Sequence, residues 1–269
     1  MSNFIVKRGE IIPLEIRSSI SIRYRSITKA INREFRSILS DTSYSMYVGS
    51  YGRGTAIDTS DIDMLVELPR EEYNRYNTYK GNGQSRLLQA VRDAVISSYP
   101  RTEIRADGQV VKVCFSDGMK FEILPAFTGK KWNGEKIFEY PDTNMGGNWR
   151  TTNPIKEQAE MRMINVLSKG LLFDTCKHIR FIRDNYFSSY HLSGIVIDSF
   201  VFASIYGRSW DVNAKNGDVS DGEFETFLYG NYLNEYRYAT QIPAPGSKEA
   251  VSLVSSKECL EKVLFKMLQ

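Results

Sequence analysis

A glycine-rich segment leads directly into an alternating pair of aspartates, and this arrangement constrains the fold more than any other feature of the chain. The segment spans residues 47–66 and reads YVGSYGRGTAIDTSDIDMLV. In an extended strand successive side chains point to opposite faces, so Asp61 and Asp63 share one face and the apolar residues beside them share the other. Two carboxylates on one face suit Mg²⁺, which prefers hard oxygen ligands.

The residues before the aspartates favour binding of a phosphate. Gly49, Gly52 and Gly54 carry no side chains that would shield the backbone N–H groups. The main chain and the hydroxyls of Ser50 and Thr55 can therefore approach a triphosphate. No Gly-Lys-Ser/Thr follows the loop and no G-x-G-x-x-G opens a helix, which excludes a Walker A loop and a dinucleotide fingerprint. The combined pattern indicates a site where nucleotide and metal meet.

A hairpin further along the chain supplies a third acid. Residues 109–115 and 120–124 are predicted strands, separated by turn residues and stopped by Pro125. Glu122 lies in the return strand between apolar neighbours, and its alternative role is that of a polar residue on an open sheet face. Asp117 competes for the role of third acid, but its position indicates a turn residue.

Several motifs of the chain resemble those of one enzyme superfamily. They are Gly49-Ser50-Tyr51-x-Arg53-x-Thr55, Asp61-x-Asp63, Phe121-Glu122-Ile123-Leu124-Pro125-Ala126, Trp149-Arg150-Thr151-Thr152-Asn153-Pro154 and His178-Ile179-Arg180-Phe181-Ile182-Arg183. Together these motifs resemble the polymerase-β-like nucleotidyltransferases. More closely they resemble the bacterial CD-NTases, relatives of animal cyclic GMP-AMP synthase and the oligoadenylate synthases. The resemblance covers roughly residues 10–210.

The resemblance implies a fold and a set of site residues. The expected fold is α/β, with a polymerase-β-like nucleotidyltransferase lobe containing a mixed sheet, a C-terminal helical lobe and an NTP cleft between them. Residues 1–152, including a long N-terminal spine helix, form the first lobe, and residues 153–269 form the second. Asp61, Asp63 and Glu122 are the implied catalytic residues and ligands of two Mg²⁺ ions, or of Mn²⁺ in their place. The implied nucleotide-binding residues are Gly49, Ser50, Tyr51, Arg53, Thr55, Arg183 and Ser199.

The implied reaction is nucleotidyl transfer between NTPs, ATP among them, with release of pyrophosphate and closure of a cyclic di- or trinucleotide. In the bacterial relatives such a product signals infection to an effector protein, which implies a part in antiphage defence. Two positions depart from the family pattern. Glu122 stands where the animal relatives have Asp, and Arg183 stands where Lys is frequent, although an arginine can grip phosphate through two hydrogen bonds.

Two other functions remain open. A nucleotidyltransferase that modifies RNA, protein or a small molecule shares the Gly-Ser and Asp-x-Asp core. A non-catalytic nucleotide-binding module is favoured only by the longer side chain of Glu122.

Composition agrees with a globular enzyme that acts on a small anionic substrate. The chain has 269 residues, of which 42% are apolar and 25% charged, enough for a core that divides into lobes. The net charge is only +3 with scattered cations, so no extended nucleic-acid surface is implied. A basic stretch consists of Arg23, Arg25, Lys29, Arg33 and Arg36, and we interpret it as a solvated helix face. We expect a monomer without an obligatory nucleic-acid activator.

The cysteines and histidines suggest no metal site. Cys114, Cys176 and Cys259 are too far apart in the sequence for a zinc site or a disulfide framework. His178 and His191 have no metal-ligand spacing, and we expect both at the surface. No signal peptide and no apolar run approaching the roughly 20 residues needed to cross a bilayer is present. These features predict a cytoplasmic protein without a membrane partner.

Periodicity predicts the remaining elements. Apolar residues recur at helical spacing from Ile20 to Ile38 and again from Leu87 to Val95. Residues 128–153 are expected to be rich in loops. Asn153 is a predicted N-cap with Pro154 at the first helical position and Gly170 beyond the last turn. Further helices are predicted over residues 179–186, 195–205, 224–233 and 251–268.

Overall fold

The computed structural model describes residues 3–58 and 61–269. Its contacts group the chain into a helical unit, which consists of Met1–Ile12, Arg53–Thr59 and Pro154–Gln269, and a sheet unit, which consists of Pro13–Gly52 and Ser60–Asn153. The division between Asn153 and Pro154 lies next to the lobe boundary expected between residues 152 and 153. Met1–Ile12 and Arg53–Thr59 were expected in the first lobe, but their contacts group them with the helical unit.

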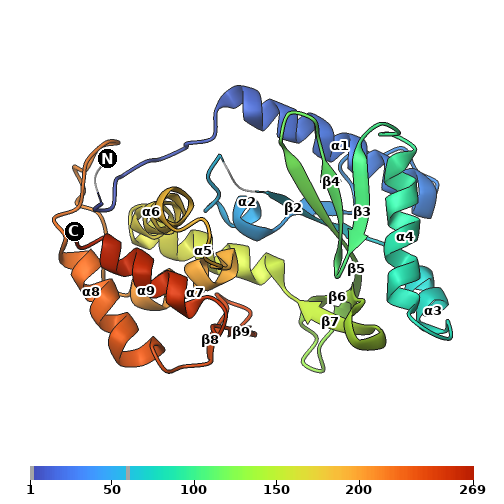
Figure 1. The fold of residues 1–269 in the computed structure, drawn as a ribbon. Helices are drawn as coiled ribbons and strands as arrows, with labels where there is room; N and C mark the ends of the chain where they lie inside the picture. Colours follow the sequence, from blue (N-terminus) through green and yellow to red (C-terminus); the bar gives the residue numbers. More distant parts are fainter. Residues whose placement is uncertain (1–2, 59–60) are drawn as a thin grey trace. The chain divides into compact units, whose positions relative to one another are not determined.

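The sheet unit contains a mixed sheet, as predicted (Figure 1). Its strands are β1 (Ser45–Tyr47), β2 (Ile62–Glu67), β3 (Glu103–Asp107), β4 (Val110–Cys114), β5 (Lys120–Lys130), β6 (Lys136–Asp142) and β7 (Asn148–Thr152). The order is β1-β2-β5-β4-β3, and β6 joins β5 to β7. Strands β2 and β5 pair in parallel, and the other neighbours are antiparallel. The predicted hairpin of residues 109–124 is confirmed as β4 and β5.

Pro125 does not end the return strand, and that prediction was wrong. Strand β5 pairs with β4 through residues 120–123 and with β6 through residues 127–130. Pro125 lies between these two pairings. A residue without an N–H group is tolerated there because neither β4 nor β6 has a ladder partner opposite it.

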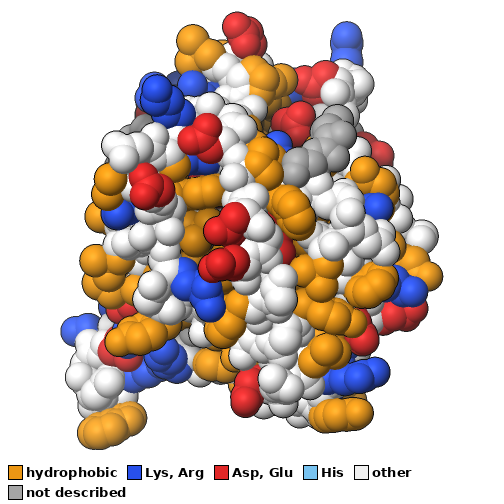
Figure 2. Space-filling view, turned by 90° about the vertical axis from the view of Figure 1, so that its left-hand side faces the viewer, with side chains coloured by type: hydrophobic (Ala, Val, Ile, Leu, Met, Phe, Trp, Pro, Cys, Tyr) orange, Lys and Arg blue, Asp and Glu red, His pale blue; other side chains and the backbone are white. Residues whose placement is uncertain are grey.

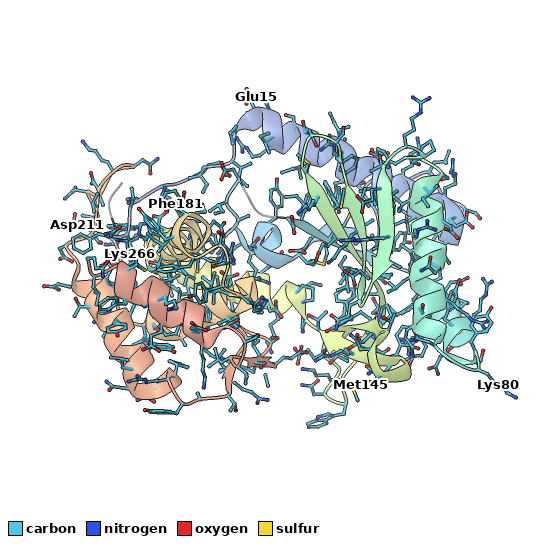
Figure 3. The ribbon with its side chains drawn as sticks, in the orientation of Figure 1. Glu15, Lys80, Met145, Phe181, Asp211 and Lys266 are labelled. Atoms are coloured by element: carbon cyan, nitrogen blue, oxygen red, sulfur yellow. The ribbon has the colours of Figure 1, made fainter. Side chains whose placement is uncertain are left out.

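The segment predicted to be rich in loops is also sheet. Strands β6 and β7 account for much of residues 128–153, and Met145, labelled in Figure 3, lies in the short turn between them. The ring of Trp149 lies 4.7 Å from Tyr73 and 5.6 Å from Phe127, measured between centroids. Trp149 therefore anchors β7 to the core of the sheet unit, whereas Trp132 is 99% exposed.

Helices α1 (Leu14–Arg36), α3 (Arg70–Asn77) and α4 (Gly83–Ile96) complete the sheet unit, together with the single turn α2 (Gly49–Arg53) at its border. The helical periodicity predicted for α1 is confirmed, since Ile20, Ile27 and Ile31 are buried. The helix ends at Arg36, so Ile38 lies beyond it. Helix α4 begins after Asn82, whose side chain accepts a hydrogen bond from the backbone N–H of Ser85.

The helical unit contains the expected series of helices. They are α5 (Pro154–Leu167), α6 (Leu171–Tyr186), α7 (Gly194–Ser204), α8 (Glu223–Asn231), continued by a π-helical turn (Tyr232–Tyr236), and α9 (Lys257–Lys266). Pro154 opens α5 as predicted. The last predicted helix is shorter than expected, because residues 250–252 form β9 (Ala250–Ser252), which pairs with β8 (Gln241–Pro243). Buried apolar residues of α6, α7 and α9 share one core cluster.

One face of the molecule carries both positive and negative charges. On the face shown in Figure 2, Lys and Arg side chains are interspersed with Asp and Glu side chains. Across residues 3–58 and 61–269, no helix combines the length and the hydrophobicity that crossing a bilayer requires.

The N-terminal segment packs onto the helical unit. Ile5 is fully buried, and its backbone N–H donates to Oε1 of Glu225 at 2.6 Å. Val6 forms an antiparallel bridge with Val219. The guanidinium of Arg8, in the same segment, lies 4.9 Å from the ring centroid of Phe181, which Figure 3 labels on α6. This segment is therefore part of the core packing of the unit.

His178 is buried beneath this segment, so the surface position expected for it was wrong. Its Nε2–H donates to the carbonyl oxygen of Asn3 at 2.8 Å, and its Nδ1 lies 3.3 Å from the Arg8 guanidinium. Burial lowers the pKa of His178 to about 4. A neutral imidazole that links α6 to the N-terminal segment has a structural role.

Candidate active site

The parallel pairing of β2 and β5 brings two of the three predicted acids together. Asp63 is the register partner of Glu122. Because side chains at paired positions of neighbouring strands point to the same face, the two carboxylates lie side by side. Their apolar neighbours Ile62, Met64 and Ile123 are buried. Asp61 directly precedes β2 and is exposed.

Gly49 lies against the Asp63 carboxylate. Its φ is +58°, and a methyl group at this position would come within 1.8 Å of Asp63 Oδ2. The backbone N–H of Val48 donates to the Asp63 carbonyl oxygen at 2.9 Å, which fixes this approach. Only glycine fits such a position without a shift of the carboxylate. The predicted phosphate loop is thus a tight turn at Gly49 followed by one turn of helix.

Ser50 and Tyr51 lie in that helical turn. The ring of Tyr51 lies 4.8 Å from that of Tyr47, which stacks on Tyr24 at 4.1 Å. Burial raises the pKa of Tyr47, and the neighbouring Tyr51 adds to this effect. The tyrosines therefore pack β1 and α2 against α1, and nucleotide contacts by Ser50 and Tyr51 remain predictions.

Glu122 faces a lysine, Lys112, that was not among the predicted site residues. Lys112 is the register partner of Glu122 on β4, and its Nζ lies 3.4 Å from Glu122 Oε1 and 2.8 Å from Asp107 Oδ2. The hydrogen bond with Asp107 raises the pKa of Lys112 and lowers that of Asp107. In the sequence, the sign of this contact was a charged residue, Lys112, between Val111 and Val113, which are both buried.

The competing acid, Asp117, lies in the turn between β4 and β5, as predicted. Its carboxylate accepts two hydrogen bonds from Arg23, at 2.8 and 3.0 Å. The Arg23 guanidinium lowers the pKa of Asp117. Because Glu122 is the register partner of Asp63 and Asp117 lies outside the strands, Glu122 is the better candidate for the third acid.

The oxygen donors fit a hard divalent cation by their chemistry, and the backbone of Gly49 lies close to the Asp63 carboxylate. The side chains are not gathered into a metal cage. Within the described ranges, no three or more His, Cys, Asp or Glu side chains are grouped so as to hold a metal ion. In this arrangement Glu122 is turned toward the ammonium group of Lys112.

Arg53 and Thr55 take part in a buried ionic cluster of the helical unit. Arg53 Nε donates to Asp198 Oδ2 at 2.8 Å, and the Thr55 hydroxyl donates to the same oxygen at 3.1 Å. Arg180 donates to both oxygens of Asp198, at 2.8 and 3.0 Å. Glu157 lies 3.5 Å from Arg53 and flanks the cluster. Arg53 and Thr55 thus hold Asp198 in this structure, and phosphate binding by these two residues stays a prediction.

The charge of Asp198 is stabilised by its partners. Burial alone would raise the pKa of this carboxyl, but the charges and hydrogen bonds of Arg180 and Arg53 outweigh burial and lower the pKa to about 2. Asp198 is fully buried and lies within the apolar helix α7. A lone acid in such an apolar stretch was the signal for this cluster in the sequence.

Ser199 is fully buried next to Asp198. Its Oγ has no hydrogen-bond partner among the residues that the structure describes. The nucleotide contact predicted for Ser199 stays a prediction.

Arg183 lies on α6, at the edge of a surface hollow of about 340 Å³. Its Nε donates to Asp184 Oδ1 at 2.5 Å, and another guanidinium nitrogen donates to the carbonyl oxygen of Leu192 at 3.2 Å. Ser188, Tyr190 and His191 also line the hollow. Arg183 remains partly exposed, and phosphate binding by this residue stays a prediction.

Comparisons with known proteins agree with the predicted fold. A family model described as the Second Messenger Oligonucleotide or Dinucleotide Synthetase domain (SMODS) matches residues 10–165. No curated protein sequence matches the chain. A solved structure of the Elizabethkingia meningoseptica CdnE cyclic dinucleotide synthase with GTP and Apcpp is 15% identical, with a TM-score of 0.61, over 98% of this chain and 94% of that chain.

Two further solved structures are similar to this chain. The Rhodothermus marinus CdnE c-UMP-AMP synthase is 12% identical, with a TM-score of 0.62, over 93% of this chain and 90% of that chain. The Bradyrhizobium diazoefficiens CD-NTase CdnG in complex with GTP is 11% identical, with a TM-score of 0.61, over 98% and 86% of the two chains. At these identities the structural likeness establishes the fold, and it confirms the predicted fold class.

Proposed function

Because this chain belongs to the Second Messenger Oligonucleotide or Dinucleotide Synthetase family of CD-NTase nucleotidyltransferases, we propose that it joins NTPs into a cyclic di- or trinucleotide and releases pyrophosphate. The observation that carries the proposal is the register of β2 and β5, which pairs Asp63 with Glu122. Two carboxylates on one face, with Asp61 at the start of the strand, supply the oxygen ligands that nucleotidyl transfer requires.

Asp61, Asp63 and Glu122 would hold two Mg²⁺ ions. When bound, the ions lower the pKa of an acceptor ribose hydroxyl and neutralise the charge of the leaving pyrophosphate. The register of β2 and β5 fixes the backbone positions of Asp63 and Glu122 before substrate binds, so only the side chains would have to turn toward the ions. The turn at Gly49 and Ser50 brings backbone close to Asp63 and would bind the triphosphate through its N–H groups.

The proposed substrates are NTPs, with ATP among them. GTP and nucleotide analogues are bound in the similar synthases from Elizabethkingia meningoseptica and Rhodothermus marinus. We propose that a separate effector protein recognises the product and that the pathway serves antiphage defence. Interspersed charges on the face in Figure 2 and a net charge of +3 give no reason for a nucleic-acid activator.

The test uses the purified, nuclease-treated protein with each of the four labelled NTPs and Mg²⁺. We expect a phosphatase-resistant product whose formation rate changes little when duplex DNA or RNA is added. Asp63→Asn should lower the rate at least about 100-fold, since it removes a metal-ligating charge and keeps the shape. Glu67→Gln is the matched control on the same strand, where Glu67 pairs with Lys136 at 3.7 Å.

The proposal fails if Asp63→Asn forms product at the rate of the unaltered protein. It also fails if the label is transferred only to RNA, protein or a small molecule that is not an NTP. Linkage-specific nucleases then identify the bond in any cyclic product.

A further inference from the structure

Lys112 holds a position between two carboxylates on one face of the sheet. Its Nζ lies 2.8 Å from Asp107 Oδ2 on β3 and 3.4 Å from Glu122 Oε1 on β5. Its neighbours Val111 and Val113 are fully buried on the other face of β4, so the lysine cannot turn away from this face without disrupting the strand. About 30% of the side-chain surface of both Lys112 and Glu122 is exposed, which leaves the pair open to solvent ions.

We propose that Lys112 is a positioning residue that competes with the divalent cation for Glu122, and that Asp107 holds the lysine back when the cation binds. This inference rests on the proposed function, because it takes Glu122 as a metal ligand. An ammonium group and a divalent cation repel each other, so the presence of one near a carboxylate weakens the binding of the other. Asp107 already forms the shorter contact, and Lys112 can keep that contact while it releases Glu122.

Among residues 3–58 and 61–269, Lys112 forms its ion pairs with Asp107 and Glu122. Arg105 on β3 is its register partner and carries the same charge. Arg105 in turn lies 3.9 Å from Glu103 on the same strand. Asp107 and Glu122 are therefore the acids between which Lys112 is shared, and changes at these two positions should have opposite effects on the cation.

The experiment measures binding of Mn²⁺ alone to the full chain, without nucleotide, from the loss of the free-ion signal in electron paramagnetic resonance. Lys112→Met should lower the Kd for Mn²⁺ by about two- to fivefold, the range expected for a partly exposed ion pair. Asp107→Asn should raise the Kd by a similar factor, because Lys112 then pairs with Glu122 alone. Lys112→Arg should stay close to the unaltered protein, since the positive charge is kept.

A double variant tests whether Glu122 is the point of competition. In a Glu122→Gln background, Lys112→Met should no longer change the Kd for Mn²⁺. The Mg²⁺ concentration that gives half-maximal product formation should shift in the same directions as the Kd. A merely structural role of the lysine would instead make Lys112→Met and Asp107→Asn act in the same direction, with a fall in melting temperature for both.

The inference is overturned if Lys112→Met and Asp107→Asn shift the Kd for Mn²⁺ in the same direction. It is also overturned if Lys112→Met still changes this Kd in the Glu122→Gln background. These failures differ from failure of the proposed function. If Asp63→Asn weakens Mn²⁺ binding and stops product formation while Lys112→Met changes nothing, only the inference about Lys112 is wrong. If Asp63→Asn changes neither Mn²⁺ binding nor product formation, both proposals are wrong.

Discussion

Asp198→Asn removes the negative charge at the centre of the buried cluster that holds Arg53 and Arg180. Arg180 is 1% exposed, and among residues 3–58 and 61–269 Asp198 is the carboxylate with which it forms ion pairs. After the substitution, the hydrogen bonds that remain to Arg180 go to the carbonyl oxygens of Cys176 and Gly194. A buried guanidinium without a counter-charge is strongly unfavourable.

Two arguments give the size of the effect. The pKa of Asp198 falls from 3.8 to about 2, which at about 1.4 kcal/mol per pKa unit corresponds to about 2 kcal/mol of stabilisation of the charged form. Removal of one partner from a buried ion pair costs about 3–5 kcal/mol in measured cases. We therefore expect Asp198→Asn to lower the free energy of unfolding of the helical unit by about 2–5 kcal/mol.

Hydrogen exchange of peptides from α6 and α7 measures this loss in the unit concerned. A loss of 2–5 kcal/mol speeds exchange through opening of these helices by about 30-fold to several thousand-fold. Peptides from β4 and β5 serve as an internal reference. Asp93→Asn is the matched control, because its pair with Arg92 at 2.9 Å is exposed and contributes at most about 1 kcal/mol. Exchange in α6 and α7 of Asp198→Asn within threefold of the unaltered protein would refute this reasoning.

Three further predictions concern the turn at Gly49, the loss of stability at low pH and the packing of β7 through Trp149. Gly49→Ala should lose activity and about 1–3 kcal/mol of stability, measured by product formation and thermal denaturation, whereas Gly81→Ala, also at positive φ but with open space, keeps activity. Because the folded-state pKa of Asp198 is lowered to about 2, its contribution to folding stability is present above the unfolded value near 4 and is lost as the pH falls toward 2. Acid titration by circular dichroism should show a smaller loss of stability over this pH range in Asp198→Asn. Trp149→Ala should cost about 2 kcal/mol in urea unfolding through lost aromatic contacts, and Trp132→Ala, at an exposed site, almost nothing.

The local part of the site could be predicted from sequence. Alternation predicted Asp61 and Asp63 on one face of a strand, and turn residues around Asp117 defined the hairpin that carries Glu122. The pairing of Asp63 with Glu122 could not be derived from those patterns. Register between strands that are distant in sequence depends on how the whole sheet assembles, and no local rule determines it.

Tertiary contacts account for features that the local patterns did not predict. The motif around Arg53 gave no sign of its ion pair with Asp198, which lies 145 positions later. Residues 128–153 were predicted to be rich in loops, and Gly146 and Gly147 are indeed typical of turns. Their strands are stabilised by pairing with β5 and by packing of Trp149, which local propensity does not report.

The docking of the N-terminal segment has a consequence for biosynthesis. Ile5 is synthesised 220 positions before Glu225, which accepts its backbone N–H. The sheet unit, by contrast, has all its residues available once Asn153 has been made. Since domains fold as units while the chain grows from its N-terminus, the segment around Ile5 has to wait, unburied, until α8 with Glu225 has emerged. It therefore reaches its native place later than the sheet unit, although most of that unit follows it in the sequence.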